Sequence, residues 1–241
     1  MKKRLISVLM ILVIWQVASM LIAKEVILPL PFDVFNKMID LLKTEVFYQS
    51  IFMTLSRIAI SFMIAFVLGT LLGILSGLNQ SIYDFLYPIF KMIQTIPQIG
   101  YILVLLVWFK SITALMIIVV VMIIPNFYYN AYNGIINIDD SLKKVIQLYK
   151  KPFLYNLIHI YIPLIKGYIV SSIEQCLPLS IKVGVMAEIF VSSAKGIGKQ
   201  LYNARVNIDM ISIFAWILYM VLIISLVTYL TQLLTKRILK E

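Results

Sequence analysis

Long apolar runs constrain this chain most, because a helix needs about 20 mostly apolar residues to cross the hydrocarbon core of a membrane. Hydrophobic residues make up 62% of the 241 residues and charged residues only 13%, which is outside the range of soluble proteins. Backbone polar groups in lipid must be satisfied within their own segment, so we expect an all-α polytopic bundle. About six transmembrane helices are predicted, at residues 5–23, 51–78, 82–109, 112–132, 163–190 and 211–234.

The net charge of +10 does not point to nucleic acid, because charged residues are few and the excess is better explained by the lysines and arginines that orient membrane helices. These residues predict a multi-pass protein of the cell (inner) membrane, embedded in the lipid bilayer, with both termini and residues 137–162 in the cytoplasm. The basic residues of the predicted inner segments are Lys2, Lys3, Arg4, Lys143, Lys144, Lys150, Lys151, Lys166, Lys236, Arg237 and Lys240.

A single membrane domain over residues 1–241 is expected, with an N-terminal helix at 5–23 and a core at 50–235. Between them, Pro29 and Pro31 end one helix, and Asp33 is predicted to cap an amphipathic helix on the outer surface. Its apolar stripe is predicted to comprise Phe35, Met38, Ile39, Leu42 and Val46.

The stretch "VSSAKGIGKQL" suggests half of a phosphate-binding loop, yet Gln200 follows Gly198-Lys199 and Ser193 stands where the first glycine belongs. The chain therefore has no nucleotide-binding loop and no predicted catalytic residue. One histidine and one cysteine, Cys176, cannot build a multi-ligand metal cage, so no metal site and no cofactor bound by this chain are expected.

Ionisable residues at membrane depth are candidates for a pathway or gate, because each costs about 2.5–3.5 kcal/mol at a helix centre. Arg57 and Glu188 are predicted to lie at the outer ends of two different spans and to pair there. For Arg57, Lys182 and a further ionisable residue at membrane depth, Lys91, snorkelling to an interface is an equally good interpretation. The complete set of pathway or gate candidates, including a proline that can break a helix, is Arg57, Pro97, Glu174, Lys182 and Glu188.

Gly69, Gly73 and Gly77 form a G-x-x-x-G-x-x-x-G stripe on one helix face, where small residues let helix backbones approach closely. Packing within the bundle of this chain is favoured over a dimer seam.

The segment 137–162 is the largest predicted cytoplasmic piece, and its first part is amphipathic. Acidic residues suit the N-terminus of a helix there, and Pro152 should end it. Such a helix docks on a partner or rests on lipid, and the pattern leaves both open. The residues of this candidate docking element are Asp139, Asp140, Leu142, Lys144, Val145, Ile146, Tyr149 and Lys150.

From Leu28 to about Leu234 the chain resembles the permease subunits of ATP-binding-cassette (ABC) importers of the nitrate, sulfonate and taurine type. The resemblance is carried by "LPLPFDVF", "TLSRIAISFMIAFVLGTLLGILSGL", "TIPQIGYILVLLVWF" and above all "IKVGVMAEIFVSSAKGIGKQLYNARVNID". It implies that Gly196 and Gly198 form an outer turn. It also implies that residues 137–162 are the coupling segment, similar to the E-A-A-x-x-x-G signature, although Lys144, Ile146 and Lys150 replace its Glu, Ala and Gly.

The resemblance further implies a non-catalytic importer subunit with three kinds of partner. These are a dimer of ABC ATPase subunits that binds ATP and magnesium, a second permease copy in a homodimer or heterodimer, and an extracellular or periplasmic solute-binding protein. The solute would be a small anionic or organic molecule such as a sulfonate, nitrate or a vitamin precursor. The alternative is a self-sufficient secondary transporter or channel subunit, although no convincing repeat relates the two halves of the chain.

Overall fold

The computed structural model describes residues 2–148, 151–191 and 195–238, and all regular structure within those ranges is helical. The bundle is therefore all-α, as predicted. The elements in chain order are α1 (Lys2–Ile22), α2 (Pro31–Leu42), α3 (Glu45–Leu78), α4 (Gln80–Thr95), α5 (Gln98–Trp108), α6 (Ser111–Ile136), α7 (Asp140–Leu148), α8 (Phe153–Asn156), the π-helical segment η1 (Leu157–Tyr161), α9 (Ile162–Leu164), α10 (Lys166–Phe190), α11 (Ile197–Val206) and α12 (Met210–Ile238).

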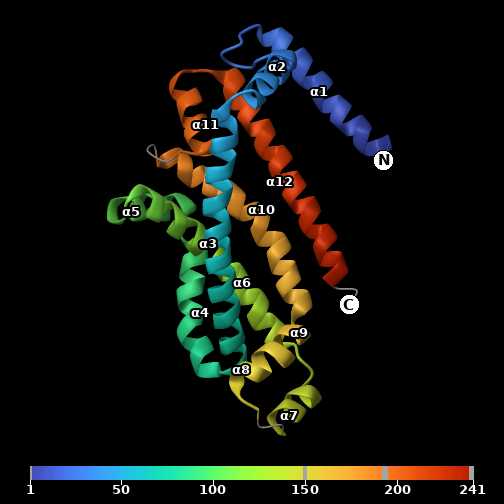
Figure 1. Ribbon diagram of the computed structural model, residues 1–241, viewed down its shortest axis with the longest axis vertical. Helices are drawn as coiled ribbons and strands as arrows, with labels where there is room; N and C mark the ends of the chain where they lie inside the picture. Colours follow the sequence, from blue (N-terminus) through green and yellow to red (C-terminus); the bar gives the residue numbers. More distant parts are fainter. Residues whose placement is uncertain (1, 149–150, 192–194, 239–241) are drawn as a thin grey trace.

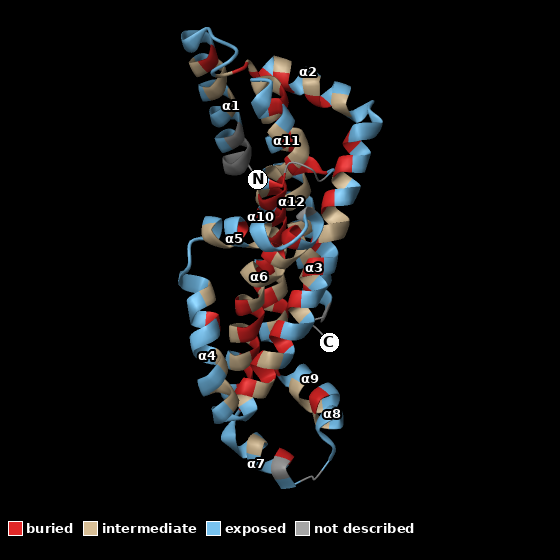
Figure 2. Ribbon diagram, turned by 90° about the vertical axis from the view of Figure 1, so that its left-hand side faces the viewer, coloured by how far each residue is buried: buried red, intermediate tan, exposed pale blue. Residues whose placement is uncertain are grey.

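The long helices α3, α4, α6, α10 and α12 run along the long axis of the molecule (Figure 1). Helices α2 and α11 lie at one end of this bundle, and α7 and α8 lie at the other. Buried side chains are concentrated where α6 and α10 pack against α3, whereas α7 and α4 are largely exposed (Figure 2). The core of the chain is therefore the α3–α6–α10 unit.

The stripe of small residues on α3 faces α6. A Cβ atom at Gly69 would lie 2.7 Å from the Cβ of Phe127, and one at Gly77 would lie 2.6 Å from the Cβ of Ile135. At Gly73 the corresponding distance to the Cβ of Ala131 is 2.8 Å. These separations leave no room for a side chain, so the three glycines allow close packing of two helices of the same chain.

Four helical segments in the described part of the chain are long and apolar enough to cross a membrane, namely Glu45–Leu78, Ile112–Ile136, Lys166–Phe190 and Met210–Arg237. In α1 the apolar stretch Leu9–Ile22 is shorter than these four. The prediction of one continuous span over 82–109 was wrong, because α4 and α5 meet at an angle of 101°. If this bent pair forms one span, the count becomes five rather than the expected six.

The break between α4 and α5 lies at Ile96 and Pro97. Both residues are extended, with φ/ψ of −71°/131° at Ile96 and −56°/136° at Pro97. A proline disfavours helical geometry in the residue before it and offers no N–H to continue the helix, which explains the break. Pro88, by contrast, lies inside α4 and Pro178 inside α10, so neither interrupts its helix.

The predicted amphipathic helix is present as α2, but it begins and ends earlier in the chain than predicted. It begins at Pro31, its N-cap is Leu30 rather than Asp33, and it ends at Leu42, so that Val46 belongs to α3. Its buried side chains are Pro31, Val34 and Met38, while Phe35 and Ile39 from the predicted stripe are 46% and 54% exposed. Packing against α12 decides which side of α2 is buried: the Tyr219 hydroxyl on α12 donates a hydrogen bond to the Met38 carbonyl oxygen at 2.7 Å.

Candidate functional site

The predicted ion pair between Arg57 and Glu188 is present. Glu188 lies near the end of α10 with a side chain only 1% exposed, and Arg57 on α3 has a side chain 12% exposed. The Arg57 Nη1 and Glu188 Oε1 atoms are 3.0 Å apart. A carboxylate buried this deeply is tolerable only with a charged partner and further hydrogen bonds.

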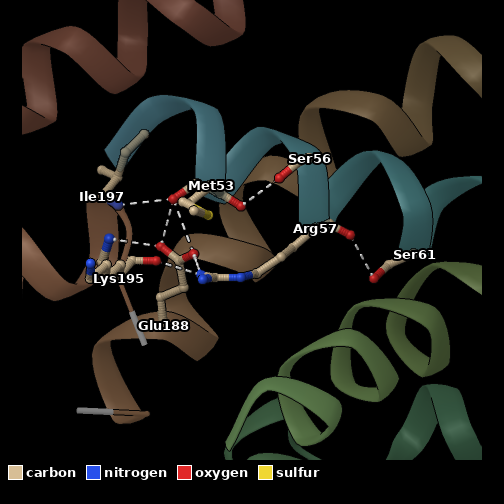
Figure 3. Close-up of polar contacts among 9 residues, drawn as sticks. Met53, Ser56, Arg57, Ser61, Glu188, Lys195 and Ile197 are labelled. Carbon is tan, nitrogen blue, oxygen red and sulfur yellow. Dashed lines mark hydrogen bonds and ion pairs between the residues drawn. The ribbon is translucent and has the colours of Figure 1, made fainter. Parts of the chain in front are cut away.

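Those further hydrogen bonds come from Thr54 and from the start of α11 (Figure 3). The Thr54 hydroxyl lies 3.0 Å from Oε1 and 2.8 Å from Oε2 of Glu188, to which it donates. The Gly198 backbone N–H donates to Oε2 at 2.9 Å, and the Ile197 N–H donates to Thr54 Oγ1 at 2.9 Å. The carboxylate therefore also accepts from the N-terminus of a helix, where the helix dipole favours negative charge.

The two glycines of "KGIGK" make this approach possible. A Cβ atom at Gly198 would lie 2.6 Å from the Val185 carbonyl oxygen, and one at Gly196 would lie 2.6 Å from the Glu188 Cδ atom. Close contact with α10 and its carboxylate, rather than phosphate binding, thus explains the glycine-rich sequence in the structure.

Arg57 also donates to the Lys195 carbonyl oxygen at 2.5 Å, in the segment that leads into α11. The arginine therefore joins α3 both to α10 and to the start of the next helix. We define the cluster of Thr54, Arg57, Glu188, Ile197 and Gly198 as the α3–α10–α11 polar cluster. Its net effect is to hold α3, α10 and α11 together (Figure 3), at the end of the bundle where α11 lies (Figure 1).

The other candidate pathway residues lie elsewhere. Glu174 is about four helical turns before Glu188 on α10, and it accepts a hydrogen bond from the Thr235 hydroxyl of α12 at 2.5 Å. Lys182 is exposed near the middle of α10, and Pro97 lies at the bend between α4 and α5. The predicted set is therefore not one site, and only Arg57 and Glu188 come together within it.

The predicted coupling segment contains α7, and Asp139 organises its start. The Asp139 carboxylate accepts from the Ser141 N–H at 2.7 Å and from the Ser141 hydroxyl at 2.5 Å. These hydrogen bonds lower the pKa of Asp139 below its ordinary value. The capping therefore persists as the pH falls until it passes through that lowered pKa, and only then is it lost.

Ile146 of α7 was predicted to contact a partner, but it faces the bundle of its own chain. Ile146 is 7% exposed and lines a small cavity of about 120 Å³ with Ile135, Ile138 and Tyr161, so it anchors α7 to its own bundle. Lys143 also ties α7 to the bundle, because its Nζ donates a hydrogen bond to the Ile136 carbonyl oxygen at 3.0 Å. Tyr149 and Lys150, also predicted to contact a partner, lie outside the described residues.

Beside the anchored Ile146, α7 carries an exposed apolar row. Leu142 is 43% exposed, Val145 47% and Leu148 80%, and their i, i+3, i+6 spacing places them along one side of the helix. Lys144 and Asp140 are exposed beside them. Sequence reasoning missed Leu148, although its place three residues after Val145 was a usable signal.

Comparison with known proteins identifies the family. Residues 65–240 match the family described as binding-protein-dependent transport system inner membrane component. The chain belongs to this family. Glu188, Gly198 and α7 lie inside the matched range, whereas Thr54 and Arg57 lie before it.

A similar curated protein is the formylaminopyrimidine transport permease protein ThiX of Halalkalibacterium halodurans. It is 24% identical over 211 residues, which cover 86% of this chain and 82% of the relative. The present chain is accordingly a multi-pass membrane protein and a permease component of an ABC transporter.

Proposed function

We propose that this chain is the permease subunit of an ABC importer and forms the solute pathway together with a second permease copy. Separate ATPase subunits would supply the energy by binding ATP and magnesium, and an extracellular or periplasmic binding protein would deliver the solute. The family match carries this proposal. It is supported by α7, which presents an apolar row to solvent at one end of the bundle.

Helix α7 has the properties that ATPase coupling requires. It is capped by Asp139, anchored to the bundle by Ile146 and Lys143, and exposes Leu142, Val145 and Leu148 on its free side. An anchored element with an apolar outer side can transmit movement of a docked ATPase to the helices above it. Lys144 beside this row suits an acidic rim on the partner.

The α3–α10–α11 polar cluster is proposed to set the gate at the opposite end of the pathway from α7. It joins three helices through one buried carboxylate, so a movement of α11 away from α10 would expose Glu188 and break several hydrogen bonds together. Such a cooperative contact favours two discrete arrangements over gradual opening.

For the solute we propose a small anionic or organic molecule. The name of the ThiX relative specifies formylaminopyrimidine, which favours a nitrogen-containing organic ring compound over nitrate or a simple sulfonate. We expect labelled formylaminopyrimidine to be taken up by cells that carry the complete transporter and to be competed poorly by taurine or nitrate. Stronger competition by taurine would favour the sulfonate assignment.

The importer proposal itself is tested without knowledge of the solute. A tagged chain purified from its own cells should bring down an ATPase, and ATP hydrolysis should appear with this complex and be absent from the isolated chain. Solute movement through the isolated chain in liposomes, independent of ATP, would instead establish the secondary transporter or channel alternative.

A further prediction concerns topology: both termini and α7 face the cytoplasm, and the α10–α11 turn faces outside. With Cys176 fully buried, an added cysteine provides the reactive thiol. A membrane-impermeant thiol reagent added to intact cells should label Lys195→Cys and leave Lys144→Cys unlabelled until the cells are opened. The reverse pattern would invert the proposed orientation.

A further inference from the structure

Helix α6 carries a row of asparagines along one side. Asn126, Asn130 and Asn133 follow i, i+4, i+7 spacing, and each is half-buried or exposed within the apolar span Ile112–Ile136. The Asn130 amide donates to the Asn126 backbone carbonyl oxygen at 2.8 Å, which fixes its direction along the helix. Three carboxamides on one side of a membrane helix are unsuited to contact with lipid.

Helix α10 carries a second polar row, formed by Tyr168, Ser171, Gln175 and Lys182. Tyr168, Gln175 and Lys182 are seven residues apart, so they lie almost directly above one another. All three are exposed, and the Gln175 amide donates to the Ser171 hydroxyl at 3.2 Å. The row runs through the membrane-span segment Lys166–Phe190.

The two rows lie on the same side of the molecule. Gly184 of α10 and the Ile124–Phe127 turn of α6 both pack against α3, which covers the opposite side of the pair. At the inner end the rows meet, because the Asn137 amide donates to the Tyr168 hydroxyl at 3.1 Å. Together they form one polar face, defined here as the α6–α10 polar face.

We propose that the α6–α10 polar face lines an aqueous solute path and that Lys182 makes this path selective against cations. This inference rests on the proposed permease function and specifies its solute class. Asparagine, glutamine and serine side chains offer both donors and acceptors to a polar solute. No carboxylate belongs to this face, since Glu174 points to Thr235 of α12 instead. The path therefore suits a small solute that is uncharged or anionic.

Lys182 supplies the only full charge on this face. Among the residues that the structure describes, no ion pair involves Lys182. An ammonium group without a countercharge in a narrow polar path repels cations and attracts anions at some distance. The alternative is that Lys182 extends to the membrane interface and that the α6–α10 polar face contacts lipid or protein. Water would then not reach Gln175.

Charged thiol reagents distinguish these possibilities. In membranes that contain the assembled transporter, Gln175→Cys is treated with two methanethiosulfonate reagents, one bearing a sulfonate and one a quaternary ammonium. Each labelling rate is divided by the rate of the same reagent with a small free thiol, because the reacting thiolate itself favours the cationic reagent. Both should label the site, with the normalised rate about fourfold higher for the anionic reagent, because Lys182 lies two turns or roughly 10 Å away. The parent chain, with Cys176 buried, is the blank.

Three further variants complete the test. Lys182→Gln should reduce the ratio of the two rates to about one, and Lys182→Arg should retain it. Leu230→Cys is the control: Leu230 is an exposed apolar residue of the span Met210–Arg237, we expect it to contact lipid, and its cysteine should remain unlabelled. If Gln175→Cys does not assemble, Ser171→Cys is used in its place, and the anionic reagent should again be favoured over the cationic one.

Two outcomes overturn the inference. If neither reagent labels Gln175→Cys or Ser171→Cys in assembled transporter, the α6–α10 polar face is dry and lines no path. If labelling occurs with a rate ratio that Lys182→Gln leaves unchanged, Lys182 does not select by charge. Neither result affects co-purification of an ATPase, so failure here is separable from failure of the importer proposal.

Discussion

Replacing Arg57 with methionine is expected to destabilise the folded chain by about 3–5 kcal/mol, because it leaves the Glu188 carboxylate buried without a cation. The side chain of Glu188 is only 1% exposed and cannot recover its hydration by a small movement. The Lys195 carbonyl oxygen loses its donor in the same variant. We expect a strongly reduced amount of assembled transporter in the membrane and a lower unfolding temperature of the protein that remains.

Glu188→Gln should be milder, since Arg57 is 12% exposed and can reach water, while a glutamine carbonyl can still accept from Gly198. A cost of about 1–3 kcal/mol is expected for the altered hydrogen bonds. The double variant Arg57→Met/Glu188→Gln should be more stable than Arg57→Met alone, because no charge is then left unpaired.

The exposed pair of Lys43 and Asp40 serves as the matched control, because its atoms are also close, at 2.9 Å, while both side chains are about 70% exposed. Lys43→Met should leave the unfolding temperature unchanged within error. Additive effects of Arg57→Met and Glu188→Gln would show that the two side chains stabilise the chain independently, and the gate proposal would lose its basis.

Features that depend on local sequence were predictable. Apolar runs placed the long helices, the glycine spacing on α3 indicated a close helix contact, and two ionisable residues at similar outer depth indicated a pair. In each case one physical rule applies to residues within one segment or to two segments whose relative depth is fixed by the membrane.

Features that depend on which side of a helix meets another helix were not predictable. Ile146 and Val145 are adjacent and equally apolar, yet one lies against the bundle and the other faces solvent. The sequence also could not show which proline breaks its helix: the chain bends by 101° at Pro97, whereas Pro88 and Pro178 leave their helices continuous. Nor could the sequence show that Thr54 and Gly198 complete the hydrogen bonding of Glu188, since they are distant along the chain from one another.

The second large effect is expected from a substitution in the exposed apolar row of α7, which lies beside the anchored Ile146. Val145→Asp places a carboxylate on the exposed apolar row without disturbing Ile146, which anchors the helix. If an ATPase covers this row, an unpaired charge is buried at the contact at a cost of several kcal/mol. Affinity should fall by more than about 100-fold, and ATPase co-purification and ATP-dependent uptake should be lost together.

Ile39→Asp is the matched control, because Ile39 is 54% exposed on the short amphipathic helix α2 at the other end of the bundle. It introduces the same charge at an equally exposed apolar position and should leave ATPase co-purification intact. Ile146→Asp is a poor substitute for Val145→Asp, because a carboxylate in that 7% exposed position would destabilise α7 itself.

The competing interpretation of α7 is a helix that rests on the inner leaflet with no protein partner. Leu142, Val145 and Leu148 would then lie among lipid chains, and Lys144 would lie near phosphate groups. Val145→Asp would weaken only that lipid contact, so the chain would still insert, still bring down its ATPase and still support uptake. Retention of all three in Val145→Asp would therefore remove α7 from the coupling pathway, whereas loss of the last two with normal insertion would place the ATPase on the Leu142–Val145–Leu148 row.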